Sequence, residues 1–103
     1  MLISNTSNLI RIKALQFDYR LVSSKEGKLI VSHKDDKNQI LKVLVLAKVT
    51  FYEKFEQRYL TIYYRTNMML IMDFETEEAT DKYIAKLSKL IEFYQSRDLE
   101  LKQ

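Results

Sequence analysis

The chain of 103 residues contains no cysteine, no proline, no tryptophan and a single glycine. Without cysteine it forms no disulfide, offers no thiolate to zinc and has no cysteine nucleophile. Because Gly27 is the only glycine, glycine-rich phosphate loops, dinucleotide-binding fingerprints and nucleophile elbows are excluded too. No apolar run exceeds five residues, the length of the run at 43–47, whereas a membrane-spanning helix needs about 20. These absences narrow the function by removing several classes of enzyme and any helical membrane segment.

The composition is that of one small folded domain. Hydrophobic residues make up 47% of the chain and charged residues 30%, and 17 lysines and arginines against 14 acidic residues leave a net charge of +3. The chain shows no repeat and no linker, so we expect one β-rich domain at 9–97 between a flexible segment at 1–8 and a tail at 98–103. Since neither a signal peptide nor a lipidation motif is visible, we expect a cytoplasmic protein.

From Leu9 onward, apolar and polar residues alternate with the period of two that half-buried β-strands show. The alternation slips by one residue between Ala14 and Leu15, which indicates a β-bulge or a bend between two strands. A turn follows at 23–27, and we expect its Gly27 to take a positive φ. Residues 28–32 then form a short strand, and a polar loop follows.

The stretch 40–55 is too long for one average strand. It predicts either one long bent strand or two strands with a break near 46–48. Leu44 and Leu46 fall on one face of this stretch, opposite a longer set of alternating apolar residues. We assign that longer set to the core, and it comprises Leu41, Val43, Val45, Ala47, Val49 and Phe51.

Two more strands and a helix complete the pattern. Residues alternate again in 59–65 and 68–74, and Thr66-Asn67 between them suits a two-residue hairpin. Thr76 then predicts an N-cap, and the acidic residues after it favour the start of a helix over about 77–96. The apolar stripe of this helix has helical spacing and comprises Tyr83, Ile84, Leu87, Leu90, Ile91 and Tyr94.

This order of elements resembles the pleckstrin-homology-like superfold, and the GRAM and bacterial pleckstrin-homology-like domains in particular. The matching stretches are KEGKLIV at 25–31, the long strand region 40–51, YLTIY at 59–63 and MLIMDFETEEA at 69–79. The resemblance implies an α+β fold in which one C-terminal amphipathic helix caps a strongly bent antiparallel sheet, or partly open barrel, of about six to seven strands. It also implies a binding or adaptor module. The chain departs from many members of the family because its helix has no tryptophan.

Catalytic, metal and lipid sites find little support in the sequence. His33, the only histidine, lies in a polar loop, so a serine triad would have no other base and a transition-metal site no second imidazole. Lipid-binding relatives of the resembled family use clustered basic residues in the first loop, and 11–13 is the nearest match here. We therefore expect no enzyme activity, no cofactor and no metal, and we do not expect binding to phosphoinositides or to a membrane surface.

Protein–protein interaction, including self-association as a homodimer, is the function that the sequence favours. Several apolar side chains are surplus to the predicted core, and methionine and aromatic residues are enriched in interfaces. The candidate partner-binding residues are Leu44, Leu46, Phe55, Met69 and Ile71.

The alternative is a small basic protein that binds single-stranded nucleic acid. Basic residues interleaved with tyrosines on a sheet neutralise phosphates and stack on bases. The residues of this candidate face are Lys42, Lys48, Tyr52, Tyr59, Tyr63 and Arg65.

Overall fold

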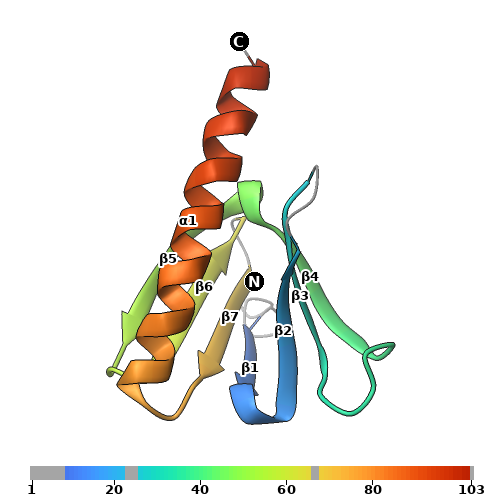
Figure 1. Cartoon of the computed structure of the whole chain (residues 1–103), viewed down its shortest axis with the longest axis vertical. Helices are drawn as coiled ribbons and strands as arrows, with labels where there is room; N and C mark the ends of the chain where they lie inside the picture. Colours follow the sequence, from blue (N-terminus) through green and yellow to red (C-terminus); the bar gives the residue numbers. More distant parts are fainter. Residues whose placement is uncertain (1–8, 23–25, 66–67, 103) are drawn as a thin grey trace, which may run out of the picture.

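A computed structural model describes residues 9–22, 26–65 and 68–102, and for 98–102 the backbone alone. Seven strands precede one long C-terminal helix (Figure 1). The strands are β1 (Leu9–Lys13), β2 (Phe17–Val22), β3 (Lys28–His33), β4 (Ile40–Val45), β5 (Val49–Phe55), β6 (Tyr59–Tyr64) and β7 (Met68–Asp73). The other elements are the 3-10 turns η2 (Ala14–Gln16) and η3 (Leu46–Lys48) and the helix α1 (Glu77–Lys102).

The strands form two sheets that splay apart (Figure 1). One has the order β1-β7-β6-β5 and the other the order β2-β3-β4. β1 runs parallel to β7, and every other pairing is antiparallel. The turns η2 and η3 carry the chain from one sheet to the other, so the predicted slip at 14–15 and the predicted break near 46–48 are both corners between sheets. The fold is therefore α+β with seven strands and a C-terminal helix, as predicted at that level. The expected single antiparallel sheet is divided between two sheets, and one of its pairings, β1 with β7, is parallel.

The core lies between the two sheets and α1. Both sheets turn one face inward, and the helix covers the gap with Tyr83, Leu87, Ile91 and Tyr94, all of them buried. Tyr83 also donates a hydrogen bond of 3.1 Å to the backbone oxygen of Tyr19 on β2, which ties the helix to the smaller sheet. Since apolar burial is the main stabilising term, the predicted helix stripe is the part that joins the two sheets into one domain.

The predicted inward face of 40–55 is wrong before η3. Leu44 and Leu46 have no exposed surface, whereas Leu41 and Val43 are each 40% exposed. The physical reason is that five consecutive apolar residues satisfy either phase of a period-two pattern, so alternation cannot choose the inner set. After η3, Val49 is inside, but a register shift next to it turns Phe51 outward.

Gly27 does not take a positive φ, which corrects the expected turn geometry. Position 27 needs a glycine for a different reason, which is lack of space beside the Tyr94 ring. A Cβ at this position would lie 2.5 Å from Cδ2 and 2.6 Å from Cζ of Tyr94, and closer still to Cε2. The left-handed positions of the described chain are Glu56, Gln57, Arg65 and Glu75. A chain with one glycine therefore makes these turns on larger residues, at a conformational cost.

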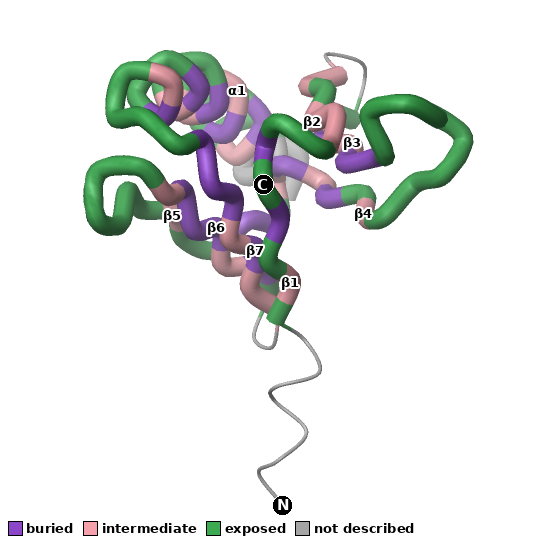
Figure 2. The backbone as a smooth tube through the Cα atoms, turned by 90° about the horizontal axis from the view of Figure 1, so that it is seen from below, coloured by how far each residue is buried: buried purple, intermediate pink, exposed green. Residues whose placement is uncertain are grey.

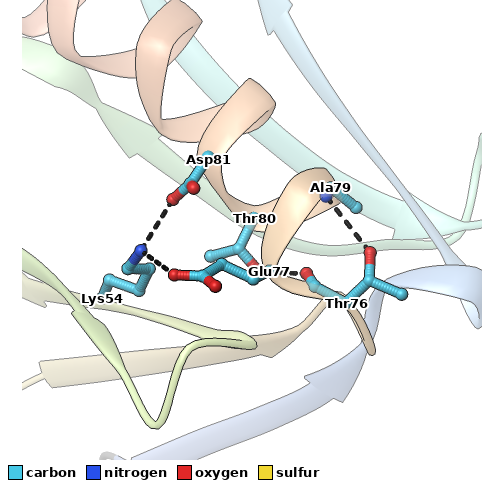
Figure 3. A network of polar contacts seen from close by, with 6 residues as sticks. All are labelled: Lys54, Thr76, Glu77, Ala79, Thr80 and Asp81. Atoms are coloured by element: carbon cyan, nitrogen blue, oxygen red, sulfur yellow. Dashed lines mark hydrogen bonds and ion pairs between the residues drawn. The ribbon is translucent and has the colours of Figure 1, made fainter.

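The start of α1 is the one predicted (Figure 3). The hydroxyl of Thr76 accepts a hydrogen bond of 3.2 Å from the backbone N–H of Ala79, which is the geometry of an N-cap. Lys54 of β5 reaches across to Glu77 at 2.7 Å and Asp81 at 2.9 Å. These two hydrogen bonds raise the pKa of Lys54, that to Glu77 more strongly.

The end of α1 differs from the expectation. The helix continues to Lys102, past the predicted end near 96, because no glycine or proline interrupts it. No helix in the described part of the chain is both long and apolar enough to span a membrane. The expected flexible segment at 1–8 and the Thr66-Asn67 turn lie outside the described residues, although β6 and β7 on either side of that turn pair antiparallel.

Candidate functional site on the four-stranded sheet

The four-stranded sheet has one face that no described element covers. α1 and the smaller sheet lie on its other side, as the view along the sheet shows (Figure 2). The pairings of the four strands place the side chains of this face in three rows that run from β1 through β7 and β6 to β5. The rows are Leu9–Met69–Tyr63–Phe51, Arg11–Ile71–Thr61–Glu53 and Lys13–Asp73–Tyr59–Phe55. We call these twelve residues the outer face.

The outer face exposes large aromatic side chains to water at its β5 edge. Phe51 is 57% exposed and Phe55 is 55% exposed. Each of these rings lies beside a tyrosine of β6, with ring centroids 5.8 Å apart for Phe51 and Tyr63 and 6.2 Å apart for Phe55 and Tyr59. Contiguous exposed apolar patches rimmed by polar residues mark interaction sites more often than chance, so this face is the leading candidate site.

A groove of about 580 Å³ crosses one end of the outer face. Arg11 and Lys13 of β1 lie on one side of it, and Phe55 and Glu56 lie on the other. Its remaining lining residues are Ile12, Gln16, Phe17, Tyr59, Ile71 and Asp73. This volume lies within the range of sites that bind side chains or small molecules, and its walls combine aromatic surface with a few charges.

Some polar groups of the outer face already have hydrogen-bond or ion-pair partners within the chain. Arg58 holds Asp73 through hydrogen bonds of 3.0 and 2.6 Å, and this contact lowers the pKa of the Asp73 carboxyl. The Tyr63 hydroxyl donates a hydrogen bond of 3.0 Å to Glu53, which raises the pKa of Tyr63. Arg11 lies at the β1 edge and is exposed. The face thus has cations at its β1 edge and a carboxylate at its β5 edge.

Comparison with protein-family models, curated proteins and solved structures gives no match to this chain.

Among the described residues, no group of three or more histidines, cysteines or carboxylates is placed to hold a metal ion. His33 is exposed at the end of β3, and its ring packs beside Phe17 with centroids 5.0 Å apart.

The predicted nucleic-acid residues do not share one face. Lys42 belongs to the other sheet and Lys48 to η3, while Tyr52 packs against the core on the inner side of β5. Arg65 follows β6, with its guanidinium 5.4 Å from the ring centre of Tyr64. Of the six residues, only Tyr59 and Tyr63 lie on the outer face.

Three of the five predicted partner-binding residues do lie on the outer face. Phe55, Met69 and Ile71 all belong to the outer face, whereas Leu44 and Leu46 are core residues and cannot contact a partner in this structure. Apart from these three and the two tyrosines, sequence reasoning missed the other members of the face, above all those of β1. Their place depends on the parallel pairing of β1 with β7, two strands separated by most of the chain, and no local pattern announces such a pairing.

Proposed function

We propose that the chain is a non-enzymatic protein-binding module that uses the outer face of its four-stranded sheet. The fold proposed with it is pleckstrin-homology-like: a strongly bent sheet or partly open barrel of about six to seven strands, capped by the C-terminal helix. The arrangement of the seven strands and α1 is compatible with that architecture.

The observation that carries the proposal is that large apolar and aromatic side chains lie in register across the outer face. They are exposed at its two edges, on Leu9, Phe51 and Phe55, and half-buried on β7 and β6 between those edges. A solvent-facing sheet normally alternates apolar inner residues with polar outer ones. Here Met69 and Ile71 lie at the centre of the outer side of β7, and phenylalanines follow on β5. Burying such a surface against a partner lowers the free energy of the system, because apolar area is removed from water.

Protein is favoured over nucleic acid because of the charges on this face. A single-stranded nucleic acid needs cations distributed along its phosphates. The outer face instead carries Glu53 beside Tyr63, and this carboxylate would repel phosphate there. At Tyr59, the guanidinium of Arg58 lies over the ring but is already paired with Asp73. Lys54, the nearest lysine of β5, is bound to Glu77 and Asp81 on α1.

The experiment is site-specific photo-crosslinking in cell extract, with benzoylphenylalanine replacing one phenylalanine at a time. Phe55 reports on the outer face, and Phe93 on α1 is a matched control because their side chains are 55% and 51% exposed. We expect covalent protein adducts, a second copy included, from position 55 and none from position 93.

Two results would contradict the proposal. One is equal yield from both positions, which would show that the outer face is an ordinary surface. The other is adducts at position 55 that nuclease removes, which would establish the nucleic-acid alternative instead.

A further inference from the structure

We propose that the partner bound by the outer face is a second copy of this chain, related by a two-fold axis that runs parallel to the strands. The proposal rests on the proposed function, since it names the occupant of the same face. It is carried by the way the charges of the face are ordered across the sheet.

The middle row of the outer face has opposite charges at its two ends. It begins with Arg11 on β1, passes through Ile71 and Thr61, and ends with Glu53 on β5. Since neighbouring strands lie about 4.8 Å apart, the two charges are about 14 Å from each other, too far to pair within one chain. The row is therefore polar at both rims, opposite in sign, and uncharged between them.

A two-fold axis in the plane between two stacked sheets has two simple orientations. An axis perpendicular to the strands stacks β1 on β1 and β5 on β5, so Arg11 would face Arg11 and Glu53 would face Glu53. An axis parallel to the strands stacks β1 on β5, so each Arg11 faces Glu53 of the second copy. Charge complementarity selects the parallel axis, and the symmetry makes the pair occur twice.

The same axis gives the other two rows suitable partners. Leu9 comes to face Phe51 of the second copy, and Met69 comes to face Tyr63. At the groove, Lys13 comes to face Phe55 of the second copy and the neighbouring Glu56. Aligned sheets pack about 10 Å apart with their side chains interleaved, a distance that these long side chains span.

The size of the face predicts a weak dimer. Four strands and three rows give a flat footprint of about 19 by 20 Å. That is about half of the roughly 800 Å² that each partner buries in a standard stable interface. We therefore expect association that depends on concentration and on salt.

The test is sedimentation velocity of the purified chain from about 10 μM to 1 mM, the range in which a weak interface populates both states. Arg11→Glu alone and Glu53→Arg alone each place like charges opposite each other twice per dimer. Each should weaken association about tenfold or more. Arg20→Glu is the matched control, because Arg20 is an exposed strand arginine of the other sheet.

Two combinations of these substitutions distinguish the proposed Arg11–Glu53 pairing between copies from a general effect of charge or a loss of folding. The double variant Arg11→Glu/Glu53→Arg should dimerise like the unmodified chain. Mixing the two single variants should also restore dimers, because each then offers the charges that the other lacks. The far-ultraviolet circular dichroism of every variant confirms that it is folded.

Three results would overturn the proposal. They are a monomer at all concentrations, a dimer that Arg20→Glu weakens as much as Arg11→Glu does, and a double variant that stays monomeric. A monomer that nevertheless crosslinks to another protein through position 55 would end the dimer proposal and leave the proposed function standing. A dimer with no crosslink at position 55 would overturn both.

Discussion

Gly27→Ala tests how closely α1 packs against the sheets through the Tyr94 ring. The φ of Gly27 is not positive, so alanine is compatible with the backbone, and its smaller unfolded-state entropy alone would stabilise the protein by about 0.4–1 kcal/mol. Against this, the new Cβ would lie within 2.6 Å of several Tyr94 ring atoms, a distance at which the ring must move. Overpacking of this kind costs about 1–3 kcal/mol. We expect a net loss of about 1–2 kcal/mol in the free energy of unfolding.

The assay is urea unfolding followed by far-ultraviolet circular dichroism, performed as a double-mutant cycle with Tyr94→Ala. Removing the Tyr94 ring opens the space, so in that background Gly27→Ala should change sign and stabilise the protein. Additive effects, or a stabilising Gly27→Ala while Tyr94 is intact, would refute the account of why this chain keeps its one glycine.

Three further substitutions test the helix and the sheet by urea unfolding. Thr76→Ala removes the N-cap of α1 and should cost about 1 kcal/mol, with Thr76→Ser as the conservative control. Tyr83→Phe removes the hydrogen bond to the Tyr19 carbonyl and should cost about 1 kcal/mol. Burial raises the pKa of Tyr83 in the folded state, so stability should fall as the pH rises above about 10. Tyr83→Phe should make that fall shallower; an unchanged slope would contradict the burial of this hydroxyl. Arg58 lowers the pKa of Asp73, so the stability from this pair is present above about pH 4 and is lost as the pH falls below it. Asp73→Asn should flatten that acid limb of the urea midpoint, and a limb as steep as in the unmodified chain would contradict the assignment.

Local patterns predicted the elements well because they depend on neighbours in the chain. The alternation in 59–65 and 68–74, the cap at Thr76 and the stripe of α1 all rest on spacing within one element. The corners at η2 and η3 were visible as a slip and as excessive strand length. What the sequence could not show was the direction of the strand faces at those corners.

The candidate site depended on that direction and on distant pairings. Leu44 is inside and Phe51 outside, the reverse of the prediction. A 3-10 turn and a register shift each rotate the strand between them, and both phases of the pattern are apolar. The outer face also needs β1 beside β7, which joins the first strand to the last. Phe55, Met69 and Ile71 were recognised because they were apolar beyond the need of the core. Arg11 and Glu53 were not, since a charge on a strand is informative only once its neighbours are known.

The most direct measurement of the central claim uses the methionine methyl groups as probes in nuclear magnetic resonance. Met69 lies on the outer face, and Met72 is fully buried on the inner face of the same strand, which makes it an internal control. When the protein is concentrated, or a protein partner found by crosslinking is added, the methyl signal of Met69 should shift while that of Met72 stays in place. A Met69 signal that stays constant under both conditions would contradict the claim that this face binds protein.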